Sequence, residues 1–383
     1  HVYTAITAEN ETLGMYGFHP RAFFEVIVPF TEDQFQLLGV QIDYLENTSG
    51  KRIPSYLEVI PLIEGPSRLS KIPEILGGYV QGMKRIWDVD LHYVRPFAAR
   101  SDPALDSGLV AADLFAIGSQ SEFEKFSAQS KVPAFPILGA VQSAFRYDHP
   151  EHEVREAVQR LNEVLPETQG RILSEQEMNQ LAELMDVFST AYKGIVTRRE
   201  NGRMPVADQI IEVANNFIPS HRERAGHVGY FGYSRGVEST DAEGLPRAIK
   251  YVAAFMSMGV PPELVGMGEG LAKARERGLS EALECLLPQL KSDLAGSLRY
   301  VNMEAGDYFA RGSEAWASIR EDIHACAAYT GEEIGPQTAS EVRHLLHTRN
   351  FVELYKRVEN DADVAKEMEE EAIKSARQRR YLG

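Results

Sequence analysis

Residues 56–64 read YLEVIPLIE, an apolar run that ends in a carboxylate. Its Val, Ile and Leu residues and the Gly65-Pro66 that follows predict a buried strand ending near Glu64. Comparable runs lie on both sides of it, at 23–30 (FFEVIVPF), 91–100 (LHYVRPFAAR), 133–139 (PAFPILG) and 225–233 (AGHVGYFGY). Strands that are apolar throughout are typical of parallel sheets covered on both faces.

Helical patterns separate these runs, notably at 68–86 and 104–117. Alternating strands and helices predict parallel βαβ units. Because the runs lack a dinucleotide-binding glycine fingerprint, we favour a barrel over a doubly wound sheet. The expected fold class is therefore α/β, a TIM-type (β/α)8 barrel elaborated with many additional α-helices, mostly in the C-terminal half.

The C-terminal half contains clear helix starts. Ser174 and Glu177 form a capping box before a long helix that runs through Tyr192, and Thr338 and Glu341 repeat this pattern. Two further helices are predicted at 151–165 and 350–378.

No repeat or linker divides the chain. We therefore expect a single barrel-type catalytic domain over 1–383. The main barrel strands would lie in 1–150, and 151–383 would be mostly helical with the remaining barrel elements.

Composition limits the function. The chain has 383 residues and a net charge of −16, which argues against a nucleic-acid or anionic-membrane partner. Two cysteines are too few for a disulfide framework, and no signal peptide or membrane-spanning run is present, so we expect a cytoplasmic protein. An anionic small molecule would need a local pocket of arginines.

Polar residues follow several predicted strands. They are Glu64, then Arg100-Ser101-Asp102, then Tyr233-Ser234-Arg235. In parallel barrels the active site lies where strands end. Carboxylates suit Mg²⁺, and arginines bind phosphate or carboxylate in a bidentate manner.

Each of these residues also has a structural interpretation. Asp102 precedes Pro103, a common helix start, and Glu64 could be a plain loop carboxylate. Arg235 could be an exposed turn residue. Arg247 is more suggestive, because a cation in the first turn of a helix is unfavourable unless an anion lies beside it. His149 and His152 lack a third ligand for zinc.

Seven stretches together resemble the archaeal-type phosphoenolpyruvate carboxylases, in the same order along the chain. They are FFEVIVPFT (23–31), EVIPLIE (58–64), ARSDPALDSG (99–108), VQSAFRYDHP (141–150), GYFGYSR (229–235), LPRAIKYVAAFMSMGVPPELVG (245–266) and QRRYLG (378–383). The resemblance implies a TIM-type barrel enzyme that converts phosphoenolpyruvate and bicarbonate to oxaloacetate and phosphate, through carboxyphosphate and pyruvate enolate. It also implies a homotetramer.

The resemblance further implies roles for individual residues. Glu64 and Asp102 would hold the catalytic Mg²⁺ or Mn²⁺. Arg235 and Arg247 would be the catalytic arginines. The substrate-binding residues would be Arg100, Ser101, Gln142, Arg146, Ser234 and Gly383.

The sequence departs from this family in two places. It starts at His1, after the N-terminal segment in which the family carries an essential histidine, and Gly139 runs almost directly into Val141, where the family has a mobile loop. We expect both segments to belong to the protein although this sequence lacks them. Were they truly deleted, the chain would be an inactive barrel scaffold. Another magnesium-dependent barrel lyase or aldolase acting on a pyruvate enolate is a further alternative.

Overall fold

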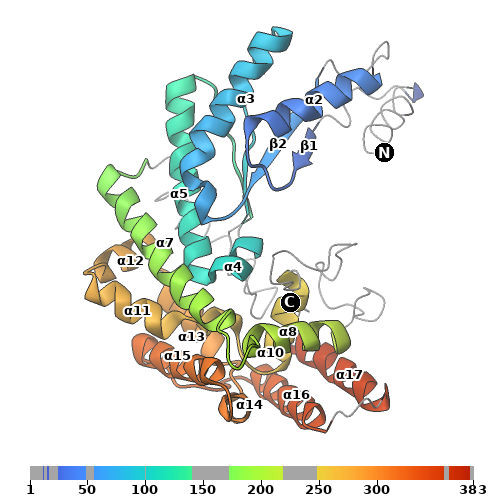
Figure 1. The fold of residues 1–383 in the computed structure, drawn as a ribbon, viewed down its shortest axis with the longest axis vertical. Helices are drawn as coiled ribbons and strands as arrows, with labels where there is room; N and C mark the ends of the chain where they lie inside the picture. The colour runs from blue at the N-terminus through green and yellow to red at the C-terminus, as the bar shows by residue number, and fades with distance from the viewer. Residues whose placement is uncertain are drawn as a thin grey trace. The chain divides into compact units, whose positions relative to one another are not determined.

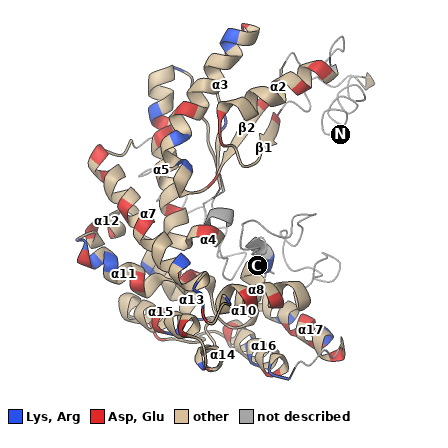
Figure 2. Cartoon of the chain, viewed as in Figure 1, with Lys and Arg blue, Asp and Glu red and all other residues tan. Residues whose placement is uncertain are grey.

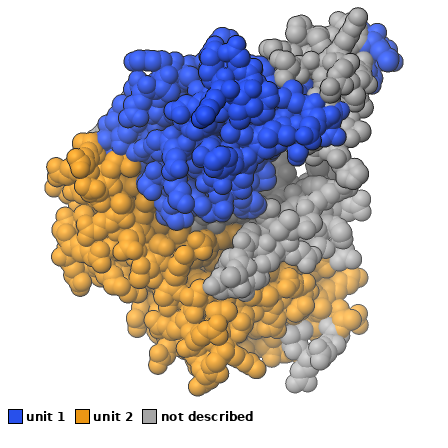
Figure 3. Space-filling view, turned by 45° about the horizontal axis from the view of Figure 1, so that its top comes forward, with its two compact units in different colours: residues 1–99, 116–139, 166–173 blue, residues 100–115, 140–165, 174–383 orange. Residues whose placement is uncertain are grey.

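The computed structural model describes residues 12, 15–16, 25–48, 56–99, 101–139, 172–218, 248–357 and 362–379. These residues form two compact units, shown in Figure 3. Unit 1 comprises residues 1–99, 116–139 and 166–173, and unit 2 comprises 100–115, 140–165 and 174–383. The single catalytic domain expected from the sequence stays a prediction, because compact units of this kind can belong to one domain.

Unit 1 is built on a parallel sheet in the order β1-β2-β3-β4. Its strands are β1 (Glu25–Val28), β2 (Glu58–Ile63), β3 (Phe97–Ala99) and β4 (Ile137–Gly139). The register aligns Ile27 with Ile60, Ile63 with Ala98, and Ala98 with Leu138. The predicted strands in 23–30, 56–64, 91–100 and 133–139 are thus confirmed, although each is shorter than its apolar run. The predicted strand at 225–233 lies outside the described residues.

Helices connect the strands of unit 1, as Figure 1 shows for α2 (Gln34–Thr48) and α3 (Ile72–Trp87) beside β1 and β2. The short 3-10 helix η1 (Pro66–Lys71) leads into α3, and α5 (Leu109–Ser130) precedes β4. The predicted helix at 68–86 is confirmed. The one predicted at 104–117 is instead two helices, α4 (Ser101–Ser107) and α5, separated by Gly108 at φ +80°.

A buried glutamine joins α2 to the start of β2. The Gln41 side-chain amide donates to the Leu57 carbonyl and accepts from the Leu57 N–H at 3.1 Å, so it pairs with both backbone groups of one residue. Both Gln41 and Leu57 are fully buried. Buried backbone groups are costly to leave unpaired, so this bond fixes where β2 begins.

Unit 2 is helical among its described residues. Its helices are α4, α7 (Glu175–Val196), α8 (Pro205–Asn216), α10 (Ala248–Ser257), η2 (Pro262–Leu264), α11 (Met267–Glu276), α12 (Ser280–Leu286), α13 (Leu290–Leu298), α14 (Met303–Ala310), α15 (Glu314–Thr330), α16 (Ala339–Tyr355) and α17 (Ala362–Arg379). Capping boxes begin α7 at Ser174 and α16 at Thr338, as the sequence predicts. The predicted helix at 151–165 lies outside the described residues.

The prediction of one final helix over 350–378 is wrong. Helix α16 ends at Tyr355, and α17 begins at Ala362 and returns antiparallel against it. Contacts run in opposite directions along the two helices, from Ser340–Gln378 through His344–Ser375 to His347–Glu371. Pairing the helices buries side chains on α17, including Met368 and Ala372, which one continuous helix would expose.

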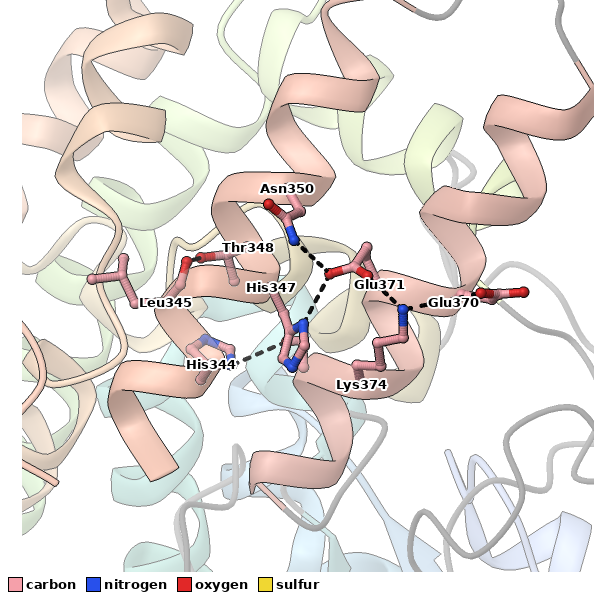
Figure 4. Close-up of polar contacts among 9 residues, drawn as sticks. His344, Leu345, His347, Thr348, Asn350, Glu370, Glu371 and Lys374 are labelled. Atoms are coloured by element: carbon pink, nitrogen blue, oxygen red, sulfur yellow. Dashed lines mark hydrogen bonds and ion pairs between the residues drawn. The ribbon is translucent and has the colours of Figure 1, made fainter. Parts of the chain in front are cut away.

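The centre of this helix pair is polar (Figure 4). Glu371 of α17 accepts from Asn350 Nδ2 at 3.2 Å and Lys374 Nζ at 2.7 Å, and its Oε2 lies 2.8 Å from His347 Nδ1. Burial alone would raise the pKa of the Glu371 carboxyl, but the hydrogen bonds from Lys374, His347 and Asn350 hold it below its usual value. The carboxylate therefore stabilises the pair in its charged form.

The described part of the chain is mostly helical with a small parallel sheet, which places it in the α/β class. None of its helices is long and apolar enough to cross a bilayer. Charged side chains of both signs lie along the helices, for example on α11 and α17 (Figure 2).

We expect Gln41→Met to lower the free energy of unfolding by about 2 to 4 kcal/mol, because it leaves the buried Leu57 N–H and carbonyl without their partner. Urea unfolding measures the change. Gln81→Met, at an exposed position of α3, is the matched control and should stay within about 0.5 kcal/mol of the wild type. Equal stability of the two variants would contradict the assigned role of Gln41.

We expect Glu371→Gln to destabilise the protein at pH 7 by about 1 to 3 kcal/mol, because charge-assisted hydrogen bonds are lost. The folded pKa lies below the usual 4.5, so the stabilisation is present above about pH 4.5 and disappears as the pH falls through the lowered value. Urea unfolding between pH 7 and pH 4 should show the wild type and variant converge. Glu370→Gln, on the same turn but exposed, should change little. A difference that persists undiminished at low pH would refute this account.

Candidate active site

The carboxyl ends of the four strands lie at one edge of the unit 1 sheet, because the strands are parallel. The loops after β1 and β2 meet there. The buried Thr31 donates its N–H to the Leu62 carbonyl at 2.9 Å and its hydroxyl to the Val28 carbonyl at 2.9 Å. An ion pair between Arg68 and Glu32 joins the same two loops farther out. These bonds fix the loops after β1 and β2 at this edge of the sheet, which we call the platform.

Glu64 lies on this platform. It is the first residue after β2 and is half-buried, next to the fully buried Ile63. Gly65 follows at φ 88° and ψ 146°, a conformation open almost only to glycine, and its carbonyl accepts from the Arg68 N–H at 3.0 Å. The turn at Gly65 thus ends the extended direction of β2 immediately after Glu64.

The strand next to β2 is β3, and the second predicted metal ligand, Asp102, follows it in the sequence. β2 and β3 are paired with Ile63 level with Ala98, so Glu64 and Ala99 stand at the same edge on adjacent strands. Asp102 comes three residues after Ala99 and, with Ser101, opens α4, which belongs to unit 2. The structure describes the backbone of Ser101 and Asp102 but not their side chains. The helix start predicted at Asp102-Pro103 is confirmed to within a residue or two, and its role as a ligand stays a prediction.

The remaining predicted site residues lie outside the described residues, and their roles stay predictions. They are Arg100, Gln142, Arg146, Ser234, Arg235, Arg247 and Gly383, together with His149 and His152. Within the described ranges, no cluster of three or more His, Cys, Asp or Glu side chains could hold a metal ion.

Unit 2 contains buried polar groups that the sequence patterns do not predict. Asp322 of α15 accepts from the Gly266 N–H at 2.7 Å and the Gly268 N–H at 2.8 Å, at the start of α11. Burial raises the pKa of this carboxyl to about 7, against the opposing effect of these backbone bonds. Its position at a helix start explains it as a cap supplied from a distant part of the chain. The local sequence contains no signal for such a bond.

A parallel α/β sheet with polar residues at its carboxyl edge defines an enzyme-like architecture. The comparisons with known proteins identify the family. The family model described as Phosphoenolpyruvate carboxylase matches residues 3–141 and 140–383. The match divides near residue 140, where the resemblance places the family's mobile loop.

Named relatives agree. The phosphoenolpyruvate carboxylase of Oenococcus oeni is 28% identical over 377 residues, covering 89% of this chain and 72% of the relative. That of Metallosphaera sedula is 29% identical over 381 residues, covering 86% of this chain and 70% of the relative. That of Methanothermobacter thermautotrophicus is 30% identical over 335 residues, covering 76% of this chain and 64% of the relative. The chain belongs to the phosphoenolpyruvate carboxylase family, and the resemblance seen in the sequence is confirmed.

We expect Gly65→Ala to lower stability by about 1 to 3 kcal/mol, because the backbone after Glu64 is open almost only to glycine. No atom lies within 4 Å of the added methyl group, so the strain is purely conformational. Gly77→Ala, in the middle of α3 with equal space, is the matched control and should be neutral or stabilising by up to about 1 kcal/mol. Chemical unfolding compares them, and equal effects would contradict the assigned backbone strain.

Proposed function

We propose that this chain is a phosphoenolpyruvate carboxylase, which converts phosphoenolpyruvate and bicarbonate to oxaloacetate and phosphate. The observation that carries the proposal is the family match, which extends over nearly the whole chain and includes Glu64 and Asp102. The position of Glu64 at the carboxyl edge of a parallel sheet supports it, because this is where α/β enzymes place their reacting groups.

Glu64 and Asp102 would hold Mg²⁺ or Mn²⁺. Both are carboxylates, the oxygen donors that these hard cations prefer, and both follow adjacent parallel strands. Glu64 is half-buried, and partial exclusion of water strengthens its attraction for a cation. When bound, the metal would neutralise negative charge on the substrate oxygens.

Arginines would bind the anionic groups. Arg235 and Arg247 are proposed to hold the phosphate and carboxylate oxygens as charge moves among them, since a guanidinium offers two parallel donors to either group. The remaining proposed substrate contacts are Arg100, Ser101, Gln142, Arg146, Ser234 and Gly383.

The proposed reaction has two stages. A bicarbonate oxygen attacks phosphorus, and the bond from phosphorus to the enol oxygen breaks, giving carboxyphosphate and pyruvate enolate. The bond from carbon to the bridging oxygen of carboxyphosphate then breaks, releasing CO₂ and phosphate. The enolate methylene carbon bonds to CO₂ and forms oxaloacetate. The protein must exclude water throughout, because protonation of the enolate would give pyruvate instead.

The family also suggests the larger assembly. We propose that the parallel strands of unit 1 are part of a TIM-type (β/α)8 barrel completed by the rest of the chain. We further propose a homotetramer in the cytoplasm. Analytical ultracentrifugation tests the tetramer.

A coupled assay for oxaloacetate tests the function, with phosphoenolpyruvate, bicarbonate and Mg²⁺ each omitted in turn. It requires the full-length protein, including any segments absent from this sequence. Turnover should need all three components. Glu64→Gln should lower kcat/KM by about 100-fold or more, because a charged metal ligand is lost. Direct Mn²⁺ binding, followed by electron paramagnetic resonance, should weaken in parallel.

Glu74→Gln, an exposed glutamate of α3 in the same unit, is the control and should keep wild-type activity and Mn²⁺ affinity. Metal binding and phosphoenolpyruvate binding without turnover, in a folded full-length sample, would indicate an inactive scaffold. Turnover of phosphoenolpyruvate without bicarbonate would indicate a different barrel reaction.

A further inference from the structure

Helix α4 carries Ser101 and Asp102, yet it is only seven residues long. A helix this short has little stability of its own, so its position depends on what holds it. Its last turn is held by α7 of the same unit. The Tyr192 hydroxyl of α7 donates to the Leu105 carbonyl of α4 at 2.8 Å. This carbonyl belongs to the end of a helix, where carbonyl groups have no partner within the helix.

The same hydroxyl also joins α10. The Tyr192 and Tyr251 hydroxyls are hydrogen-bonded to each other. Since Tyr192 uses its one proton on Leu105, Tyr251 donates to Tyr192. Tyr251 is fully buried and Tyr192 is 3% exposed, so water cannot readily replace either bond. One chain of two hydroxyls therefore connects α10, α7 and α4.

Two glycines pack closely against Tyr192. A methyl group at Gly108, directly after α4, would lie 3.0 Å from Tyr192 Cβ, and one at Gly266 would lie 2.6 Å from Tyr192 N. Both glycines have positive φ, +80° and +77°. The chain thus packs closely against the backbone and the base of the side chain of Tyr192.

A second contact between α7 and α4 is weaker. Lys193 Nζ lies 3.3 Å from Asp106 Oδ2, but both side chains are about half exposed, and surface ion pairs contribute little. The buried hydroxyl bond is therefore the stronger of these two polar contacts between α4 and α7.

We propose that Tyr192 is a positioning residue for the metal site, acting through α4, with Tyr251 fixing its hydroxyl. The proposal rests on the proposed function, in which Asp102 of α4 holds the divalent cation. Tyr251 extends the connection to α10, the helix that follows Arg247 in the sequence. The position of α4 would in this way affect the position of Asp102 in the proposed metal site.

Tyr192→Phe tests the proposal, because it removes the hydroxyl and keeps the ring. We expect Mn²⁺ to bind about fivefold more weakly or worse, measured by electron paramagnetic resonance on full-length protein. We expect kcat/KM for phosphoenolpyruvate to fall roughly 10- to 100-fold, the scale of a small misplacement of a catalytic group.

Tyr355→Phe is the matched control. The Tyr355 hydroxyl also accepts one bond and donates one, from Gln209 Nε2 and to Glu212 Oε2, both at 3.1 Å, in the same unit. It should lose some stability in urea while Mn²⁺ affinity and kcat/KM stay at wild-type values. Should Tyr192→Phe fail to fold, Tyr251→Phe takes its place, because it removes the bond that orients the Tyr192 hydroxyl. We expect it to weaken Mn²⁺ binding, and an Mn²⁺ affinity equal to that of Tyr355→Phe would overturn the positioning role.

The outcomes separate the two proposals. If the wild-type protein makes oxaloacetate but Tyr192→Phe binds Mn²⁺ as tightly as Tyr355→Phe does, the positioning role is overturned and the function stands. If the full-length wild type neither binds Mn²⁺ nor makes oxaloacetate, the proposed function falls and the positioning role falls with it.

Discussion

Parallel pairing of β1, β2, β3 and β4 in chain order is the constraint on which the rest of unit 1 depends. Each parallel neighbour requires the chain to return to the starting edge, so helices must follow the strands and all the carboxyl ends meet at one edge. The strands are short, and specific bonds fix the loops after β1 and β2. Thr31 binds the backbone of both β1 and β2 beside Glu64, and Gly65 turns the chain away.

In unit 2, apolar helix faces and buried polar groups have different effects. Apolar faces bring the helices together, and hydrogen bonds of buried polar groups determine how the helices align with one another. Gln41 in unit 1 and Tyr192, Asp322 and Glu371 in unit 2 each bind backbone ends or several partners at once. Satisfied polar groups of this kind allow few alternative arrangements, because any other packing would leave them unpaired.

Sequence patterns predicted the elements whose positions depend on neighbouring residues alone. The apolar runs located the strands, and Ser174 and Thr338 located two helix starts, because a capping box is complete within four residues. The break at Gly108 was missed although a glycine with positive φ is a common local helix end. The separation of α16 from α17 was missed because their pairing depends on tertiary packing. The bond from Tyr192 to Leu105 joins residues far apart in sequence, and an inward tyrosine on a helix resembles ordinary core. Glu64 was correctly placed at a strand end. The residues proposed to act together with Glu64 come from distant segments of the chain, so local patterns cannot show that they meet.

The proposed reaction transfers phosphate to bicarbonate before carbon is fixed. Bicarbonate labelled with ¹⁸O tests it most directly, with the phosphate product analysed by mass spectrometry after a short reaction. The account predicts one labelled oxygen in phosphate and two in the new carboxylate of oxaloacetate, because the attacking oxygen stays on phosphorus when CO₂ leaves. Oxaloacetate accompanied by unlabelled phosphate would contradict it.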